Sequence, residues 1–196
     1  MSMKLYLASG SPRRAALLRD RGWGFEQMTP PFDDSLVTLG RVNPRRAAEA
    51  LAYLKAASVA DHLSSGIVIG CDTVLAVGEH RLGKPADRKD AARMLSLVIG
   101  QEHRAISAVA LYDAMTHRRD IFTDEAVVHI EPLIADEIGS YLDSEQWRGK
   151  AGGYNLAELS DRWRFTVRGD PTTVVGLPMK MLIEHLTSFA PQAIIA

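Results

Sequence analysis

An acidic residue interrupts an apolar stretch near the middle of the chain. Residues 67–77 are apolar almost throughout and rich in β-branched side chains, which is typical of a strand buried on both faces of an α/β sheet. Asp72 lies inside this stretch, where an ionised carboxylate is costly unless a cation, a metal or several donors meet it. Lys84 follows on the next loop, in the turn G-K-P. The two side chains can converge on an anionic, metal-bearing ligand; the alternative is a structural aspartate with a local partner and a solvated surface lysine.

A second candidate lies near the start, where an apolar strand runs into S-G-S-P-R-R at residues 9–14. Ser11 suits the N-cap of a helix and Pro12 suits its first position. Unpaired backbone N–H groups and the helix dipole favour an anion there, and the guanidinium groups of Arg13 and Arg14 match phosphate oxygens. The dipole alone disfavours arginine in a first turn. The pattern therefore favours an anion site over an ordinary capped helix with solvated arginines.

Two weaker signals lie between these stretches. Asp33 and Asp34 follow a pair of prolines in an irregular region, residues 22–39. Paired acids on a loop can bind a divalent metal, although more often they form a polar turn. Lys55 lies in a predicted helix and, taken alone, is a solvated residue.

Several familiar catalytic patterns fail. Residues 78–84 spell G-x-x-x-x-G-K, but Pro85 follows, and proline has neither a hydroxyl for magnesium nor a backbone N–H for phosphate. The six histidines have no H-E-x-x-H spacing and no cysteine partners, which argues against a zinc site. Cys71 lies in the apolar strand and is interpreted as a packed small side chain. No G-x-S-x-G occurs, which argues against a serine hydrolase.

Composition narrows the class of protein. The chain has 196 residues, 46% of them hydrophobic, and its 23 basic and 24 acidic residues leave a net charge of −1. This balance gives no general basic field, so binding to nucleic acid or to a membrane surface is not expected. A single cysteine allows no intrachain disulfide, which agrees with a reducing compartment. We expect a cytoplasmic protein without a signal peptide or membrane span.

The elements that must position these residues alternate between strands and helices. Strands are predicted at 4–8, 67–77, 104–114, 120–131 and 163–167, and helices from Pro12, at 45–62, 88–97, 134–142 and 179–189. Asp87 is expected to cap the helix at 88–97 and Gly100 to end it. Residues 149–154 form a glycine-rich connection that permits close approach to a ligand. The tail, 190–196, is predicted as a strand edge or a frayed end.

Seven short motifs occur in an order that resembles the Maf family, the septum-formation-inhibitor-like nucleoside triphosphate pyrophosphatases. They are L-A-S-G-S-P-R-R at 7–14, an acid at Asp33, L-A-Y-L-K-A at 51–56, G-C-D-T at 70–73, G-K-P at 83–85, A-G-G-Y at 151–154 and V-G-L-P at 175–178. The resemblance covers about residues 4–189. It implies an α/β fold with an elongated mixed sheet, flanking helices and two lobes around a cleft, similar to inosine triphosphate pyrophosphatases, in one domain spanning 1–196. It also implies a cytoplasmic enzyme, often a homodimer, that uses Mg²⁺ or Mn²⁺ to cleave a nucleoside triphosphate to the monophosphate and pyrophosphate.

The resemblance also implies roles for individual residues. Ser9, Ser11, Arg13 and Arg14 match the phosphate-binding turn, and Lys55 and Lys84 match the two catalytic lysines. Asp72 matches the catalytic acid, a proton acceptor and metal ligand. Asp33 stands at the second metal position, where many relatives have glutamate.

The motifs are mixed with respect to the nucleotide. Arg13 and Thr73 fit the branch that acts on dTTP and UTP, but Ala157 stands where the segment Y-x-I-Q-G of that branch has glutamine, and alanine cannot hydrogen-bond a base. G-D-P-T-T at 169–173 is more like the branch that takes 7-methyl-GTP. We expect a pyrophosphatase for pyrimidine or modified pyrimidine triphosphates that removes non-standard nucleotides. The alternatives are 7-methyl-GTP as substrate, or a cell-division regulator that acts by binding partners.

Overall fold

The computed structural model describes residues 3–31, 42–78, 80–159 and 161–193. Its strands are β1 (Leu5–Ala8), β2 (Glu26–Met28), β3 (Ile67–Val77), β4 (His80–Leu82), β5 (Glu102–Asp113), β6 (Arg119–Ile130) and β7 (Phe165–Arg168). Within the described residues, these seven strands form one sheet in the order β2-β1-β3-β5-β6-β7, and β4 pairs with β3. β1 runs parallel to β2 and β3, whereas the other pairings are antiparallel, so the sheet is mixed.

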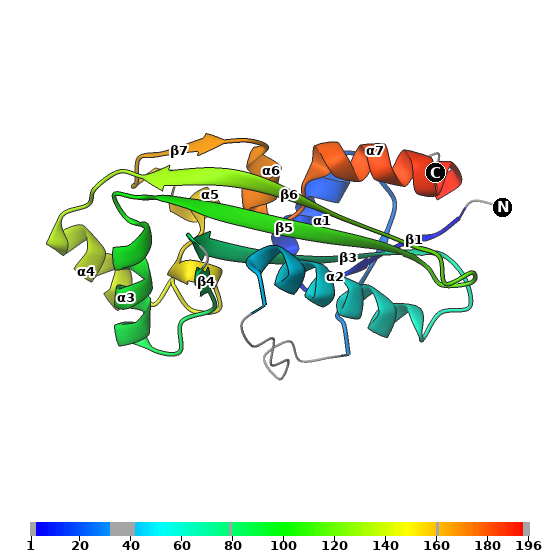
Figure 1. Ribbon diagram of the computed structural model, residues 1–196, viewed down its shortest axis with the longest axis horizontal. Helices are drawn as coiled ribbons and strands as arrows, with labels where there is room; N and C mark the ends of the chain where they lie inside the picture. Colours follow the sequence, from blue (N-terminus) through cyan, green and yellow to red (C-terminus); the bar gives the residue numbers. More distant parts are fainter. Residues whose placement is uncertain (1–2, 32–41, 79, 160, 194–196) are drawn as a thin grey trace.

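Helices cover both faces and one end of this sheet. They are α1 (Pro12–Asp20), α2 (Pro44–Ala60), α3 (Arg88–Val98), α4 (Ala135–Asp143), α5 (Leu156–Leu159), α6 (Pro171–Val175) and α7 (Met179–Phe189), with 3₁₀ turns η2 (Ala151–Gly153) and η3 (Pro191–Ala193). Figure 1 shows α2 on one side of the long strands, α1 and α7 on the other, and α3 with α4 at one end. The α/β fold with an elongated mixed sheet and flanking helices is confirmed.

The long strands give the molecule its elongated shape. β3, β5 and β6 contain 11, 12 and 12 residues and pair continuously, from Ile67–Asp113 at one end of β3 to Ala76–Arg104 at the other. At about 3.3 Å per residue, such strands span roughly 40 Å, so they run from one end of the molecule to the other. Groups on β3 are therefore held by a rigid central element.

Alternation along β3 decides which helix each side chain meets. Ile67, Ile69 and Cys71 pack in a core with α1 and α7, whereas Val68 packs with alanines of α2 on the opposite face. A third core lies at the end that carries α3 and α4. By this period of two, Asp72 faces α2 and Thr73 faces the side of α1.

β3 also leaves a gap along one edge. Its pairing with β1 ends at Gly70, opposite Ala8, and its pairing with β4 begins only at Leu75. Residues 71–74 thus lie between two strand partners, beside the carboxyl end of β1. Open α/β sheets commonly bind ligands in such a crevice beyond the strand ends.

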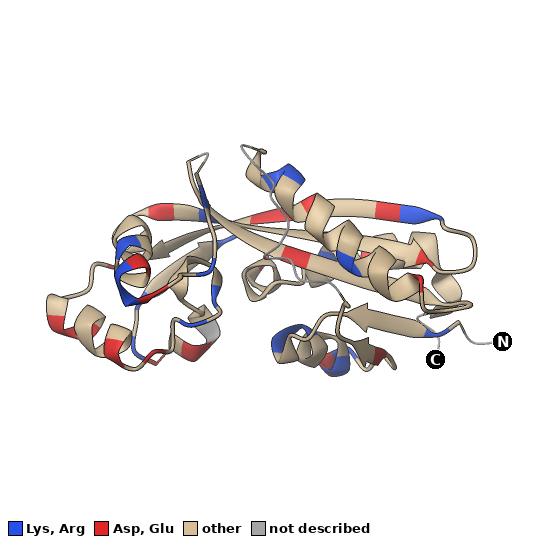
Figure 2. Cartoon of the chain, turned by 90° about the horizontal axis from the view of Figure 1, so that it is seen from below, with Lys and Arg blue, Asp and Glu red and all other residues tan. Residues whose placement is uncertain are grey.

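Charged residues of both signs occur at both ends of the molecule (Figure 2). At one end, Arg88 of α3 pairs with Asp143 of α4, the Nη2–Oδ1 distance being 2.7 Å. In the described part of the chain, no helix is long and apolar enough to cross a membrane.

Most of the expected elements are present within two residues of their predicted ends. Asp87 caps α3 through its side chain as predicted, and Ser11 occupies the N-cap position of α1 but makes no capping hydrogen bond through its side chain. The short strands β2 and β4 and the short helices α5 and α6 were not predicted from the sequence. β2 lies in the region expected to be irregular. The expectation of a strand edge in the tail is wrong for Pro191–Ala193, which form a 3₁₀ turn.

Candidate active site

The turn between β1 and α1 forms one wall of the site. Ser11 is the N-cap of α1 with extended φ and ψ angles of −74° and 118°, Pro12 begins the helix, and no side chain caps it. The backbone N–H of Ser11 instead donates to Oγ of Ser9, at 3.2 Å. No acidic residue lies in the first turn, so the helix dipole is not offset there. The predicted strand, turn and helix N-terminus are confirmed.

Arg14 ties this turn to two distant segments. Its Nε donates to the carbonyl of Gly176 at 2.8 Å, and its Nη1 donates to the carbonyl of Cys71 at 3.0 Å and to Oγ of Ser9 at 3.3 Å. Its Nη2 donates to Oγ1 of Thr73 at 3.0 Å. Arg14 thus closes the gap along the edge of β3. It brings positive charge to the site while its donors hold the protein together.

The catalytic pair expected from the family motifs is assembled across two elements. Nζ of Lys55, on α2, donates to Oδ1 of Asp72, on β3, at 2.6 Å. Both side chains are largely buried, at 13% and 11% exposure. An ammonium in direct contact offsets much of the cost of burying the carboxylate. The expectation that Lys55 is merely solvated is therefore wrong.

A glycine makes this contact possible. A methyl group at Gly70 would lie 2.2 Å from the carbonyl oxygen of Ala52 and 2.6 Å from the backbone nitrogen of Ala56, both on α2. The backbone of α2 thus lies against β3 where Gly70 has no side chain. This close approach lets Lys55 reach Asp72, two residues further along the strand.

Lys84 approaches the same space from the opposite wall. It follows β4, and the carbonyl of its neighbour Gly83 accepts a hydrogen bond from the backbone N–H of Gly152 in η2, at 2.9 Å. This hydrogen bond holds the loop that carries Lys84 against the glycine-rich connection at 149–154. The near-match to a phosphate-binding loop is part of the β3–β4 hairpin, because Val77 pairs with His80, so it lacks the helix that such a loop requires.

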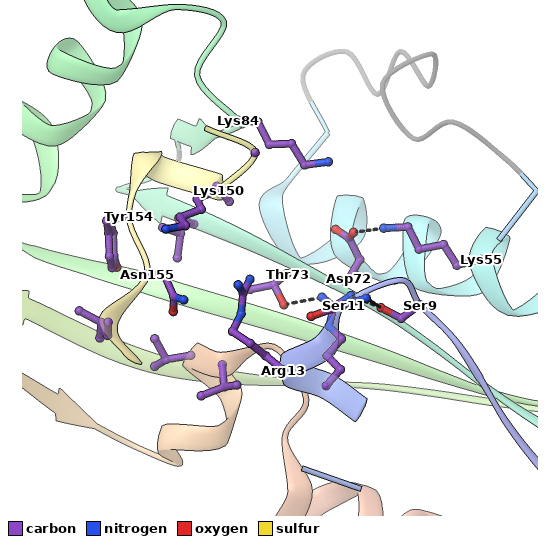
Figure 3. Close-up of a pocket in the computed structure, with 17 residues that line it drawn as sticks. Ser9, Ser11, Arg13, Lys55, Asp72, Thr73, Lys84, Lys150, Tyr154 and Asn155 are labelled. Atoms are coloured by element: carbon purple, nitrogen blue, oxygen red, sulfur yellow. Dashed lines mark hydrogen bonds and ion pairs between the residues drawn. The ribbon is translucent and has the colours of Figure 1, made fainter. Parts of the chain in front are cut away.

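A cavity of about 270 Å³ lies among these elements, and Figure 3 shows the side chains that line it. Its lining includes eight of the nine residues predicted for the site: Ser9, Ser11, Arg13, Arg14, Lys55, Asp72, Thr73 and Lys84. The ninth, Asp33, lies outside the described residues. The structure therefore gathers into one pocket residues that span more than seventy positions of the sequence.

The residues at the other end of the pocket were not predicted from the sequence as site residues. These are Leu75, Gly149, Lys150, Ala151, Tyr154, Asn155, Leu156, Val174 and Val175. Lys150 and Tyr154 belong to the glycine-rich connection, whose composition was the available signal for a ligand. Val175 begins the motif V-G-L-P at 175–178, whereas Val174 gave no signal, because it is an ordinary apolar residue until α6 brings it to the pocket.

Buried hydrogen bonds support the wall that carries Thr73. Oγ1 of Thr73 lies 2.8 Å from Oγ of Ser107 on β5, and Ser107 donates to the carbonyl of Thr173 at 2.7 Å. Thr173 in turn donates to the carboxylate of Asp124 on β6. The hydroxyl of Thr73 is therefore held between Arg14 and Ser107, which fixes its place beside the pocket.

Burial decides the ionisation of groups next to the pocket. Desolvation lowers the pKa of His103 to about 4, so this imidazole is neutral at pH 7, and it bonds to the hydroxyl of Tyr154. Burial also raises the pKa of Tyr154 and of the Cys71 thiol. Cys71 is thus an unreactive packed thiol, as its apolar strand predicted.

The described residues do not form a complete metal cage. Among them, no group of three or more histidine, cysteine or acidic side chains could hold a metal ion. Asp72 supplies one carboxylate to the pocket. Mg²⁺ at phosphoryl sites is often held by only one or two carboxylates, with substrate phosphates and water completing the shell. The donor set therefore fits a cation that arrives with a polyphosphate.

Comparisons with known proteins bear on the family to which the chain belongs. A family model described as "Maf-like protein" matches residues 4–189. The chain is 35% identical over 190 residues to a dTTP/UTP pyrophosphatase of Desulforamulus reducens, covering 97% of this chain and 98% of that one. It is 38% identical over 174 residues to a dTTP/UTP pyrophosphatase of Roseobacter denitrificans, covering 88% and 90%. Among solved structures, it is similar to a nucleoside-triphosphatase (dITP/XTP pyrophosphatase) of Mycobacterium abscessus, with 20% identity, a TM-score of 0.43 and coverage of 68% and 77%.

Proposed function

Because the chain belongs to the Maf family, we propose that it is a nucleoside triphosphate pyrophosphatase acting on dTTP, UTP or modified pyrimidine nucleotides. The products are the nucleoside monophosphate and pyrophosphate. The relatives that carry the name dTTP/UTP pyrophosphatase support this proposal over nearly the whole chain. The one cysteine, Cys71, is a free thiol, in keeping with an enzyme of the cytoplasm.

The observation that carries the proposal is the Lys55–Asp72 pair at one end of the pocket. It lies in the same cavity as Lys84 and the N-terminal turn of α1. A triphosphate concentrates negative charge, and its cleavage depends chiefly on positioning and on stabilising that charge. The pocket offers Lys55, Lys84, two arginines and a helix N-terminus around one acid, which suits this chemistry.

In the proposed mechanism, water attacks the α-phosphorus and pyrophosphate leaves. Asp72 accepts the proton of the attacking water, as a carboxylate within hydrogen-bond reach can do. Lys55 holds Asp72 before substrate binds and then, with Lys84, neutralises charge that builds up on the phosphate oxygens. Arg13 and the turn of Ser9 and Ser11 hold the polyphosphate. A divalent cation, Mg²⁺ or Mn²⁺, would be held by Asp72 and the phosphates, and by Asp33 in the sequence-based assignment; it would supply further neutralisation of charge.

Fewer residues bear on the choice of nucleotide than on the binding of the phosphates. Thr73 is fixed beside the pocket by Arg14 and Ser107, and Arg13 lines the same cavity. Both match the dTTP/UTP branch, whereas Ala157 does not supply the amide that this branch uses. Discrimination among bases must therefore come from other residues of the pocket.

The experiment that tests the proposal measures pyrophosphate release from a panel of UTP, dTTP, CTP, 5-methyl-UTP and 7-methyl-GTP, with Mg²⁺, Mn²⁺ or a chelator. We expect release from the uracil and thymine nucleotides, and loss of release with the chelator. Asp72→Asn should lower kcat by about 100-fold or more, since a general base contributes that much. Asp143→Asn, which removes an exposed carboxylate far from the pocket, is the matched control. Preference for 7-methyl-GTP would reject the assigned substrate, and no release from any nucleotide would reject the enzymatic function in favour of a binding role.

A further inference from the structure

A buried serine behind the pocket controls the hydrogen bonds of one of its walls. Ser107, on β5, is fully buried and lies directly opposite Thr73 in the pairing of β3 with β5. Its Oγ lies 2.8 Å from Oγ1 of Thr73 and donates to the carbonyl of Thr173 at 2.7 Å. Thr73 lines the pocket, whereas Ser107 is not among the described residues that line it. Any effect of Ser107 on a ligand must therefore pass through its neighbours.

The proton of each hydroxyl in this row has only one place. A carbonyl oxygen cannot donate, so the hydroxyl proton of Ser107 lies on the side of Thr173. Ser107 has no second proton, so it meets Thr73 as an acceptor and Thr73 must donate in that contact. The one proton of Thr73 is thereby used. Its oxygen has only lone pairs for Arg14, whose Nη2 donates to it at 3.0 Å.

The carbonyl at the end of this row is itself held in place. The backbone oxygen of Thr173 also accepts a hydrogen bond from the backbone N–H of Gly176, at 3.2 Å, and the side chain of Thr173 donates to Asp124 on β6. Thr173 is fully buried. The row therefore runs in one direction, from the guanidinium on α1 to the carbonyl on α6. Hydrogen bonds that run in one direction polarise and strengthen one another.

The guanidinium of Arg14 depends on its acceptors keeping their roles. Four of its five N–H groups donate to acceptors of the protein. Two of these acceptors are backbone carbonyls, which can only accept, and two are the hydroxyls of Ser9 and Thr73, each of which also has a proton to place. Ser107 takes the proton of Thr73 and so leaves that hydroxyl as an acceptor. The cation is then immobilised before a ligand arrives, which lowers the entropy cost of binding.

The same row limits what Thr73 can do for a phosphate chain. Ionised phosphate oxygens accept hydrogen bonds, and Thr73 has no proton left to give them. Its contribution to phosphate binding is therefore to hold Arg14, which lines the same pocket as Arg13 and Ser11. The fixed charge of the guanidinium favours a polyanion there.

We propose that Ser107 is a positioning residue of the polyphosphate site. It takes the proton of Thr73, which keeps Thr73 an acceptor for Arg14 and holds the guanidinium in place for a phosphate chain. This inference rests on the proposed function for the presence of a polyphosphate in the pocket. It goes beyond that function by giving a role in ligand binding to a buried residue of β5.

The test is a double-mutant cycle of Ser107→Ala and Thr73→Val. It is followed by KM for UTP and by calorimetry of pyrophosphate with Mg²⁺, because pyrophosphate carries no base. Each single variant should weaken pyrophosphate binding and raise KM by about ten-fold, the value of one hydrogen bond to a charged group. A loss of binding that is equal in the ground and transition states changes KM rather than kcat, so kcat should change much less. Ser96→Ala is the matched control, because its hydroxyl also donates to a backbone carbonyl but is exposed on α3; both quantities should stay unchanged.

The double variant separates an effect through Thr73 from a general loss of packing. If Ser107 acts through Thr73, adding Ser107→Ala to Thr73→Val leaves the affinity for pyrophosphate where Thr73→Val alone put it. Losses that multiply would overturn the inference, and so would wild-type affinity in Ser107→Ala. Thr73→Val must itself weaken binding; unchanged affinity in this variant overturns the inference however Ser107→Ala folds.

Pyrophosphate binding also distinguishes this inference from the proposed function. A wild type that releases no pyrophosphate from any nucleotide but binds pyrophosphate, with losses in Ser107→Ala and Thr73→Val that do not multiply, would reject the activity and support the role of Ser107. An active wild type whose two variants bind pyrophosphate as tightly as it does would keep the activity and overturn the role. A wild type without affinity for pyrophosphate would overturn the role as well.

Discussion

Replacing Gly70 by alanine should damage the active site without touching any catalytic group. The new Cβ would lie 2.2 Å from the carbonyl oxygen of Ala52, whereas ordinary contacts begin at 3.4 Å. Both the strand and the helix are backbone at this point, so no flexible side chain can yield. We therefore expect α2 to move away from β3 by about 1 Å, the shortfall in that contact distance.

Two consequences follow from this displacement. Overpacking of a core contact costs about 1–3 kcal/mol of unfolding free energy, which for a chain of this size lowers Tm by roughly 5 °C. The Lys55–Asp72 contact, now 2.6 Å between Nζ and Oδ1, would lengthen by a similar 1 Å. Because misplacement by about 1 Å can cost 100-fold in rate, kcat should fall by about 100-fold even at temperatures where the variant is fully folded.

The assay measures pyrophosphate release and thermal unfolding on the same samples. Gly139→Ala is the matched control, because a Cβ at this α4 position meets nothing within 4 Å. It should leave kcat unchanged and stabilise the helix by about 0.5–1 kcal/mol. A Gly70→Ala protein with normal kcat at a temperature where it is folded would refute the claim that this close approach sets the catalytic geometry.

Three further predictions concern single residues. Lys55→Ala leaves the buried Asp72 carboxylate without its ammonium partner. We expect the free energy of unfolding, measured with urea, to fall by about 3 kcal/mol and activity to be lost; wild-type stability would contradict the pairing. Arg14→Lys cannot reach all four acceptors that Arg14 contacts, and we expect a loss of about 2 kcal/mol, with wild-type stability as the contrary result. His103 has its pKa lowered to about 4 by burial from about 6.5 when unfolded. Below pH 6.5 the unfolded chain binds a proton at His103 that the folded chain does not bind. The free energy of unfolding should therefore fall by about 3 kcal/mol as pH falls from 6.5 to 4, and in His103→Asn it should depend less on pH over that range.

Local sequence signals predicted the elements well where each element carries its own pattern. Residues adjacent in the sequence are enough to predict the apolar run of β3, the Ser11-Pro12 start of α1 and the Asp87 cap of α3. β2 and β4 have three residues each and exist because a longer strand pairs with them. A pattern of three residues is too short to predict a strand.

The sequence predicted many of the residues that line the pocket, but not what each of them contacts. Family motifs named the residues that meet in the pocket, but Lys55 and Asp72 are joined only because Gly70 lets α2 approach β3. Arg14 was expected to bind substrate, and its acceptors on Cys71 and Gly176 are far from it in the sequence. Only the folded chain shows that it links three segments. The metal role of Asp33 stays a prediction.

In the proposed reaction, water attacks the α-phosphorus of a nucleoside triphosphate held by the charges around Asp72. Hydrolysis of UTP in oxygen-18 water, followed by mass spectrometry of both products, tests it most directly. We expect one labelled oxygen in UMP and unlabelled pyrophosphate. Label in pyrophosphate, or release of inorganic phosphate as the first product, would contradict the mechanism.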